Sequence, residues 1–261
     1  ALGVAPRPLE ILDHMGLLDE AQRRGIHFGA QNIVADGKLL KRIVAQDDHL
    51  PYGFLGLAQP HCEEILEGYL RRWGGKIERN RTLVGLEQSS GKVLAHFDTG
   101  DSLEARFLVG CDGAHSTVRK ALGISFEGER FQLTFLLGDV HLDWAHPHHE
   151  NWQFIRNGED GKPRQVVTVI ANPTAPGRYR ISTSVEDGFE CPEHPSLDLL
   201  RSILEPFLPP KTVISDMRWS SRYSISHRIA DNYRQGQVFL AGDAAHIHPP
   251  IGGLGMNTGL Q

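Results

Sequence analysis

The sequence predicts an α/β fold with an inserted β-rich segment, and three features of the chain carry this prediction. Two short apolar runs, one in the middle of the chain and one near its end, each lead into an aspartate, a pattern typical of buried strands in a parallel sheet. Apolar residues recur at helical spacing near the start of the chain. Beyond Gly123 the pattern changes to longer β-rich runs. Helices and strands in this mixture pack as layers around a common core.

The composition is that of a globular chain and argues against several classes of protein. With 261 residues, of which 40% are hydrophobic, the chain can bury a sizeable core. The formal net charge of -5 and the scattered basic residues argue against nucleic acid as a partner. No apolar run is long enough to predict a membrane span, and no basic-then-apolar leader indicates export. The widely spaced Cys62, Cys111 and Cys191 favour a reduced cytoplasm over a disulfide framework.

The first part of the chain contains two amphipathic helical patterns. Apolar residues recur at helical spacing from Pro8 to Arg24 and again from about His61 to Trp73. Between these patterns Asp36-Gly37 is a turn signal, which predicts a hairpin. Three strand-like runs follow the second helix and predict a β-meander that returns to a buried strand: Thr82–Glu87, Val93–Phe97 and Ala105–Val109.

Beyond Gly123 the sequence predicts a second, sheet-based module. One helix at about Leu197–Phe207 and a strand around Val213–Arg218 complete it. Its other predicted strands are Phe131–Leu142, Asn151–Ile155, Gln165–Ile170 and Tyr179–Ser184. The expected division is therefore residues 1-123 for part of one domain, including the β-meander, 124-232 for the β-sheet module, and 233-261 for the segment that returns to the first domain.

The segment Val238–Gln261 carries the most informative motif of the chain. Its apolar run Val238–Ala241 predicts a strand, so Asp243 follows the carboxyl end of that strand. Ligands of open α/β sheets bind at this edge, where a carboxylate can accept hydrogen bonds from sugar or ribityl hydroxyls. Two prolines stiffen the next turn, and glycines then leave free amides at a helix start, which favour an anionic or electron-rich ligand atom: Pro249, Pro250, Gly252, Gly253 and Gly255.

A second strand-to-aspartate turn lies within Phe107–Arg119. An apolar run leads into Asp112-Gly113, and Ser116 can cap a short helix that carries Arg119. Asp112 and Arg119 can then flank one ligand. For this segment by itself, an ordinary strand–turn–helix with a surface arginine is an equal alternative. Two such turns in one chain favour the ligand site.

Together these two segments resemble the motifs of the class A flavoprotein monooxygenases, the FAD-dependent aromatic hydroxylases of the p-hydroxybenzoate hydroxylase type. The family's Asp-Gly motif stands here as CDGAHSTVR, and its Gly-Asp motif stands as GDAAHIHPPIGGLGMN. The early segment GVAPRPLEILDHMGLLDEA is similar to the helix that follows the family's first nucleotide-binding unit. The resemblance implies a Rossmann-like FAD-binding domain, incomplete in this chain, with an inserted β-rich substrate domain.

The resemblance also implies the residues of the cofactor site. Asp243 is expected to bind the ribityl and pyrophosphate region of FAD, and residues 250–257 to face the isoalloxazine. Asp112 and Arg119 are expected where the pyrophosphate and the nicotinamide nucleotide approach, and Gln59 matches a single FAD-contacting position. The implied cofactor-binding set is Gln59, Asp112, Gly113, Arg119, Gly242, Asp243, Pro250, Gly253, Gly255, Met256 and Asn257.

The activity implied by the resemblance is hydroxylation of a small aromatic, phenolic substrate. NADH or NADPH reduces FAD, O2 adds to give a flavin C4a-hydroperoxide, and one oxygen atom passes to the substrate. The substrate is expected between the flavin and the β-rich module, against the strands at Phe131–Leu142, Asn151–Ile155 and Gln165–Ile170. No catalytic base is assigned, because Tyr223, His141 and Arg222 are candidates by chemistry only.

Several alternatives stay open. Epoxidases, halogenases and lipid-chain reductases share the fold, although the extra lysine and the tryptophan motif expected of a halogenase are not evident. A non-catalytic, truncated homologue is a further alternative, because the family's G-x-G-x-x-G fingerprint is absent from these residues. We therefore expect this chain by itself to bind FAD weakly or not at all. No metal site is predicted, because His146, His148 and His149 lack a recognisable ligand spacing.

Overall fold

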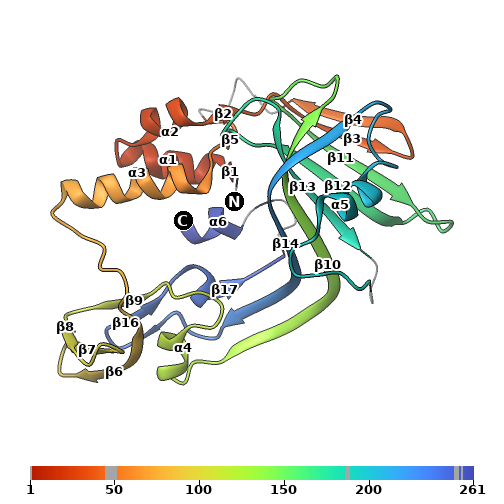
Figure 1. The fold of residues 1–261 in the computed structure, drawn as a ribbon. Helices are drawn as coiled ribbons and strands as arrows, with labels where there is room; N and C mark the ends of the chain where they lie inside the picture. The colour runs from red at the N-terminus through yellow and green to blue at the C-terminus, as the bar shows by residue number, and fades with distance from the viewer. Residues whose placement is uncertain (1, 45–51, 186–188, 250–252, 254) are drawn as a thin grey trace. The chain divides into compact units, whose positions relative to one another are not determined.

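The fold is that of a computed structural model, which describes residues 2–44, 52–185, 189–249, 253 and 255–261, without the side chains of residues 132 and 133. The chain divides into two compact units (Figure 1). The first unit contains Ala1–Leu66 and Gln132–Ser224, and the second contains Glu67–Phe131 and Ile225–Gln261. Each unit therefore combines two separate stretches of the chain.

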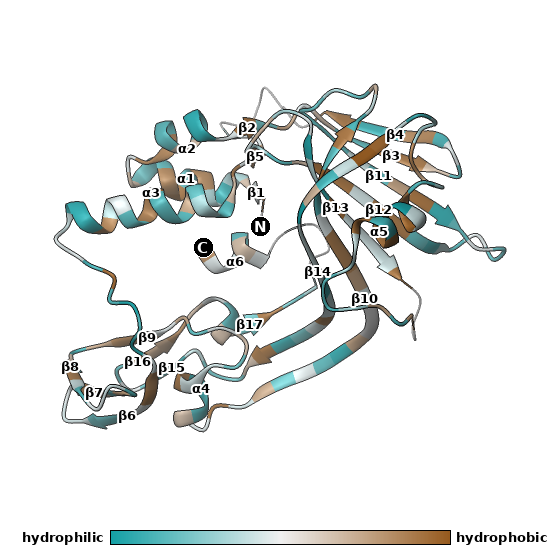
Figure 2. Cartoon of the chain, viewed as in Figure 1, coloured by the Kyte–Doolittle hydropathy of each residue, from teal (hydrophilic) through white to brown (hydrophobic). Residues whose placement is uncertain are grey.

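The helices near the start of the chain differ from the prediction in one respect. The helix predicted over Pro8–Arg24 is two helices, α1 (Pro6–His14) and α2 (Leu18–Arg24). Gly16 separates them with a φ of 70°, a left-handed conformation that ends a helix and that glycine adopts without strain. The predicted second helix is confirmed as α3 (Gln59–Arg72). Figure 2 shows that α1 and α3 each contain both hydrophobic and hydrophilic residues.

The first unit is built on a large, mostly antiparallel sheet. Its strands follow the order β14-β10-β13-β12-β11-β3-β4, and β11 with β3 is a parallel pair. Their bounds are β3 (Ala30–Ala35), β4 (Lys38–Val44), β10 (Phe126–Asp143), β11 (Glu150–Asn157), β12 (Pro163–Ala171), β13 (Arg178–Val185) and β14 (Val213–Ala230). Residues 126–131 of β10 and 225–230 of β14 belong to the second unit. A small separate sheet contains β1 (Gly3–Val4), β5 (Leu55–Gly56) and β2 (Ile26–His27).

Most strands of this sheet were expected, and two features were not. The hairpin at Asp36-Gly37 and the four predicted strands of the β-rich module are confirmed. The strand predicted at Val213–Arg218 is much longer, because β14 continues to Ala230. The β3–β4 hairpin, from segment 1-123, pairs with β11, from segment 124-232. The domain boundaries near Gly123 and Asn232 stay predictions.

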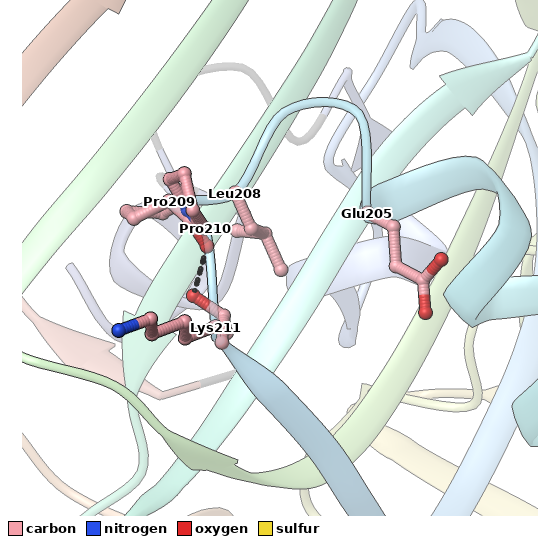
Figure 3. A pocket seen from close by; sticks show the side chains of 6 residues that line it. Glu205, Leu208, Pro209, Pro210 and Lys211 are labelled. Atoms are coloured by element: carbon pink, nitrogen blue, oxygen red, sulfur yellow. Dashed lines mark hydrogen bonds between the residues drawn. The ribbon is translucent and has the colours of Figure 1, made fainter.

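One helix covers a face of the large sheet. Ser196 caps α5 (Leu197–Leu204) by accepting a hydrogen bond from the amide of Leu199 at 3.2 Å. The loop after α5 is held by Thr212, whose hydroxyl donates to the Pro209 carbonyl at 2.7 Å. Figure 3 shows Leu208, Pro209, Pro210 and Lys211 of this loop. Leu200 and Leu204 of α5 are fully buried against the sheet.

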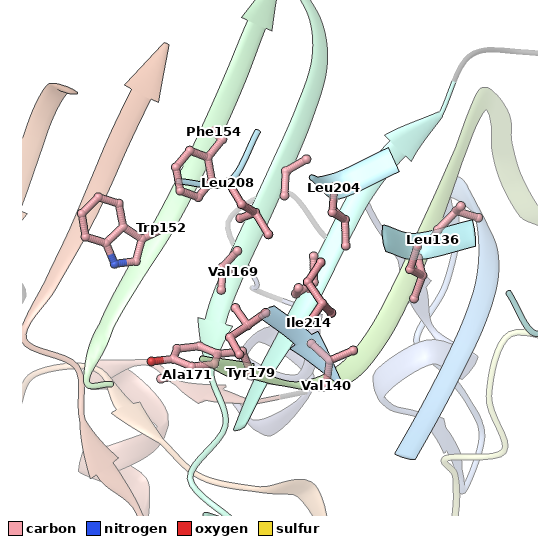
Figure 4. Close-up of a cluster of buried hydrophobic side chains, with 14 of the residues drawn as sticks. Leu136, Val140, Trp152, Phe154, Val169, Ala171, Tyr179, Leu204, Leu208 and Ile214 are labelled. Carbon is pink, nitrogen blue, oxygen red and sulfur yellow. The ribbon is translucent and has the colours of Figure 1, made fainter. Parts of the chain in front are cut away.

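The core of the first unit lies between α5 and this sheet face. It contains side chains from four neighbouring strands: Leu136, Val140, Trp152, Phe154, Val167, Val169, Tyr179 and Ile181. Figure 4 shows Leu136, Val140, Trp152, Phe154, Val169 and Tyr179 among them. Burial of each such side chain contributes roughly 1.5–3 kcal/mol to folding. Residues that alternate with them along the strands lie on the other face, where most are only half-buried.

The second unit contains a meander and a small parallel sheet. The meander is β6 (Leu83–Ser89), β7 (Lys92–Phe97) and β8 (Ser102–Ala105), and the parallel pair is β9 (Leu108–Gly110) with β16 (Val238–Leu240), which β15 (Arg234–Gln235) extends. The strand predicted over Ala105–Val109 is therefore wrong, because it joins the end of β8 to the start of β9 in a different sheet. The remaining elements are α4 (Thr117–Ala121), the 3-10 helix η1 (Gly242–Ala244), β17 (His246–Ile247) and α6 (Gly255–Leu260).

The core of the second unit lies beside the parallel pair. Val238 and Leu240 of β16 pack with Val118 of α4 and with Ala244 and Ala245 after β16. Neither unit holds a helix, among the residues described, that is both long and apolar enough to cross a membrane.

Candidate cofactor site

The two strand-to-aspartate turns lie side by side in the second unit. β9 and β16 are parallel neighbours, with Leu240 opposite Gly110, which confirms the predicted parallel strand at Val238. The amide of Ala241 donates to the Gly110 carbonyl at 2.9 Å, just beyond the last paired residues. The turns after β9 and β16 therefore lie at the same edge of this sheet, the edge at which open α/β sheets bind ligands.

Asp112 is held by its own turn. One carboxylate oxygen accepts a hydrogen bond from the Ser116 hydroxyl, and the other accepts from the amides of Thr117 at 2.7 Å and Val118 at 3.1 Å. Partial burial of Asp112 opposes ionisation, but these hydrogen bonds outweigh it and lower the pKa of the carboxyl. Both oxygens of Asp112 therefore serve the first turn of α4.

Arg119 connects the two turns from inside the protein. Its side chain is 5% exposed, so the surface arginine of the alternative interpretation is wrong. The guanidinium donates to the Ala244 carbonyl and to the Ala114 carbonyl, each at 2.8 Å. It also lies over the Phe126 ring, 3.7 Å from the centroid. Arg119 thus joins the turn after β9 to the turn after β16.

Asp243 differs from Asp112 in its hydrogen bonding, although both residues are exposed. It lies in η1 directly after β16, and its side chain is exposed. Among the described residues, no hydrogen bond or ion pair engages its carboxylate. Beside it, Gly242 has a φ of 57°, and no atom lies within 4 Å of the position of an added Cβ. An exposed carboxylate with open space beside its backbone can accept hydrogen bonds from a bound molecule.

The segment after η1 returns to the same turn. Gly255 and Met256 begin α6. A Cβ atom added to Gly259 of that helix would lie 3.5 Å from the Gly242 Cα. The buried Asn257 side chain donates to the carbonyl of Gly253 at 2.9 Å. Pro250 lies outside the described residues. The predicted residues of this segment that are described therefore lie close to the Gly242 turn.

Gln59 lies in the first unit, as the first residue of α3, and is exposed. Its side-chain amide donates to Glu63 at 2.9 Å. All other predicted cofactor residues that are described lie in the second unit. The contribution of Gln59 to a cofactor site stays a prediction.

The first unit has a polar and aromatic sheet face opposite α5. On it, Arg180 forms a bidentate ion pair with Asp139, at 2.7 and 2.8 Å, and its guanidinium lies over Trp219. Tyr223 stacks on Phe135 with centroids 5.5 Å apart. We call this surface, formed by Phe135, Asp139, Arg180, Trp219 and Tyr223, the Arg180 face.

The sequence analysis did not predict the Arg180–Asp139 pair. These residues are cross-strand partners of β13 and β10, and only the strand register brings them together. A polar residue between apolar neighbours in each strand was the sole signal.

The three candidate bases have different environments. Burial raises the pKa of Tyr223 despite a hydrogen bond with Ser182, so the phenol keeps its proton at neutral pH. Arg222 donates to the Cys191 carbonyl at 2.9 Å. His141 is half-buried on β10.

The histidines near His146 take part in ring packing. His146 stacks on Trp152 with centroids 3.8 Å apart, and His148 packs edge-on against Tyr179. Within the described part of the chain, no group of three or more histidine, cysteine or acidic residues is placed to hold a metal ion.

Comparison with known proteins identifies relatives along the whole chain. A family profile described as FAD binding domain matches residues 1–261. The rifampicin monooxygenase of Rhodococcus hoagii is 34% identical over 265 residues, which is 100% of this chain and 53% of that protein. The solved anhydrotetracycline hydroxylase from Streptomyces rimosus is 32% identical with a TM-score of 0.72, over 100% of this chain and 51% of the other.

A further solved structure is a complex of aklavinone-11 hydroxylase with FAD and aklavinone. It is 27% identical, with a TM-score of 0.79, over 100% of this chain and 52% of the other. The chain thus spans about half the length of the relatives it matches.

Proposed function

The chain belongs to the family of FAD binding domains, and on this basis we propose that it is part of an FAD-dependent monooxygenase that hydroxylates an aromatic, phenolic substrate. The co-substrates are NADH or NADPH and O2. The names of the relatives, which include monooxygenases acting on rifampicin, anhydrotetracycline and pentachlorophenol, support an aromatic substrate. The free cysteines Cys62, Cys111 and Cys191 support a cytoplasmic location.

The observation that carries this proposal is the free carboxylate of Asp243 at the carboxyl end of β16. It is exposed and accepts no hydrogen bond from the described residues. The ribityl chain of FAD carries hydroxyl groups that can donate hydrogen bonds to such a carboxylate. Gly113, Gly242 and Gly253 have positive φ angles, and added Cβ atoms there would meet nothing within 4 Å. Bare backbone of this kind lets a cofactor approach closely. The residues of the second unit therefore fit FAD.

We assign distinct tasks to the residues around this carboxylate. Asp243 would hold the ribityl side of FAD, and the described residues Gly253, Gly255, Met256 and Asn257 would face the isoalloxazine. Arg119 is a positioning residue, because its bonds to Ala244 and Ala114 fix one turn against the other. Asp112 and Gly113 form the adjoining turn. When bound, FAD would supply the redox chemistry that couples oxidation of NAD(P)H to oxygen transfer from O2.

We assign the substrate to the Arg180 face of the first unit. Its stacked pair, Phe135 and Tyr223, offers ring contacts to an aromatic substrate. The Arg180 guanidinium is half-buried and satisfied by Asp139, so it presents fixed donors without leaving an unpaired charge. Tyr223 keeps its proton and acts as a hydrogen-bond donor to a substrate oxygen.

The test of this function uses the full-length protein. We expect the absorbance spectrum of bound flavin, NAD(P)H consumption that phenolic compounds stimulate, and a hydroxylated product identified by mass spectrometry. A flavin-free protein would contradict the proposal. Flavin reduction without a hydroxylated product from any phenol would instead favour a reductase of the same fold.

A further inference from the structure

The Arg180 face holds an ion pair among its aromatic rings. Asp139 of β10 and Arg180 of β13 are direct cross-strand partners, and the guanidinium lies over the ring of Trp219 on β14, 5.2 Å from the ring centroid. The side chains of Arg180 and Asp139 are only 22% and 18% exposed, so water screens their charges less than it screens those of a surface ion pair. The charges of this pair therefore act strongly on a molecule that lies on the face.

The Asp139 carboxylate occupies the guanidinium of Arg180 in a bidentate manner. Nε of Arg180 donates to Oδ1 at 2.7 Å, and Nη2 donates to Oδ2 at 2.8 Å. This is also the geometry in which an arginine best binds the carboxylate of a ligand. Because Nη2 belongs to both donor pairs of a guanidinium, the second pair is partly used as well. A carboxylate of the protein thus takes the place that a ligand carboxylate would need.

The neighbouring arginine of β13 is also paired. Arg178 lies two residues before Arg180, so its side chain points to the same face of the sheet. It is 4% exposed, and its guanidinium donates to the carboxylate and to the backbone carbonyl of Asp216. The more exposed Arg218 lies 3.8 Å from the same carboxylate. Arg178 is therefore not available to bind an anionic ligand.

The remaining contacts of the Arg180 face suit a neutral molecule. Phe135 and Tyr223 offer ring surfaces, and the raised pKa of Tyr223 keeps its hydroxyl group neutral. Ring contacts and neutral hydrogen-bond donors need no charge on the ligand. A ligand carboxylate placed beside Arg180 would instead meet the carboxylate of Asp139, a like charge that opposes binding.

We infer that Asp139 is a specificity-determining residue, which makes the Arg180 face select neutral aromatic molecules over aromatic carboxylates. This inference rests on the proposed function, because that proposal assigns the substrate to the Arg180 face. Asp139 acts through Arg180, since it holds the guanidinium and neutralises its charge. It is thus a repulsive element against one class of ligand, and without it the same guanidinium would bind a carboxylate.

The test compares two probes by isothermal titration calorimetry of the full-length protein as purified. 4-Hydroxybenzamide and 4-hydroxybenzoate share a ring, a hydroxyl group and nearly the same shape, but only the second is an anion at neutral pH. We expect the wild type to bind the benzamide more tightly. Asp139→Asn frees the guanidinium, so the preference should move toward the benzoate by about tenfold or more, the contribution of a hydrogen bond to a charged group.

A second variant should change the preference in the opposite direction. Arg180→Gln leaves the Asp139 carboxylate without its counter-charge, so the preference for the benzamide should increase by about threefold or more. A purely structural ion pair would instead change the affinities for both probes alike in the two variants. The matched control is Asp143→Asn, which makes the same charge change at an exposed position of β10 and should leave the preference unchanged.

Circular dichroism and thermal melting check the fold of each variant, and Arg180→Gln decides the test if Asp139→Asn unfolds. The inference is overturned if the wild type binds neither probe or prefers the benzoate, if the two variants do not shift the preference in opposite directions, or if Asp143→Asn shifts it as much as Asp139→Asn. The proposed function fails separately, if phenols do not stimulate NAD(P)H consumption by the wild type. Stimulated consumption with an unchanged preference in both variants overturns only the inference.

Discussion

Asp112 and Asp243 follow neighbouring parallel strands and both are exposed, yet the structure gives their carboxylates different hydrogen bonding. The carboxylate of Asp112 accepts three hydrogen bonds from its own turn, and its pKa is lowered. The carboxylate of Asp243 is exposed and accepts none from the described residues. A strand-to-aspartate turn thus has two uses, one that stabilises the turn itself and one that leaves a carboxylate free for a ligand.

Arg119 makes the comparison possible, because it ties the Asp112 turn to the Asp243 turn. Its two bonds to carbonyl oxygens come from a buried charged group, and each bond of this kind contributes about 1.5–3 kcal/mol. The stabilised turn and the free carboxylate are therefore parts of one small assembly in the second unit.

The largest expected effect is on Arg119. Arg119→Met removes both bonds to the Ala114 and Ala244 carbonyls, so we expect the free energy of unfolding to fall by about 3 kcal/mol or more. Urea denaturation measures this. Lys120→Met, at the exposed neighbouring position, is the control and should change stability by less than about 0.5 kcal/mol. Equal effects of the two variants would refute the linking role of Arg119.

A smaller effect distinguishes the two aspartates. Asp112→Ala removes the acceptor at the first turn of α4, and loss of such a cap typically costs about 1 kcal/mol. Asp243→Ala removes no bond among the described residues, so its stability should stay within about 0.5 kcal/mol of the wild type. The same denaturation experiment compares them, and an equally large loss in Asp243→Ala would show that both aspartates are structural.

The stability contributed by Asp112 should depend on pH. The folded-state pKa of Asp112 lies below its unfolded value, so the ionised carboxylate stabilises the fold above the unfolded pKa and loses this effect as the pH falls through the folded pKa. The stability difference between the wild type and Asp112→Ala should therefore be largest near neutral pH and shrink in acid, below about pH 4. A difference that stays constant down to pH 2 would contradict this assignment.

The smallest expected effect concerns the ring under Arg119. Phe126→Leu keeps an apolar side chain but removes the cation–π contact, which contributes about 0.5–1 kcal/mol. Thermal unfolding should show a small decrease in Tm. In the Arg119→Met background the same change should cost less, and full additivity of the two variants would argue against a contact between these side chains.

Local sequence signals predicted the elements of this region well. The apolar run at Val238 predicted β16, and Ser116 caps α4 as expected, accepting from the Arg119 amide at 2.9 Å. Both features depend on residues close together in the chain. The turn signal at Asp36-Gly37 succeeded for the same reason.

The failures have a common physical cause, which is that contacts distant in sequence decide them. The partner of Arg119 at Ala244 is 125 residues away, so no local pattern distinguished a buried arginine from a surface one. The helical spacing continued across Gly16, although the left-handed backbone there divides the helix. The Arg180–Asp139 pair required the register of β10 and β13.

The central claim is that Asp243 holds the cofactor whereas Asp112 holds the turn. The most direct measurement is a titration of FAD into the flavin-free, full-length protein, monitored by flavin fluorescence, for the wild type, Asp243→Ala and Asp112→Ala. We predict that Asp243→Ala weakens FAD binding at least tenfold with unchanged stability, while Asp112→Ala lowers stability with a smaller change in affinity. Wild-type affinity in Asp243→Ala would contradict the account.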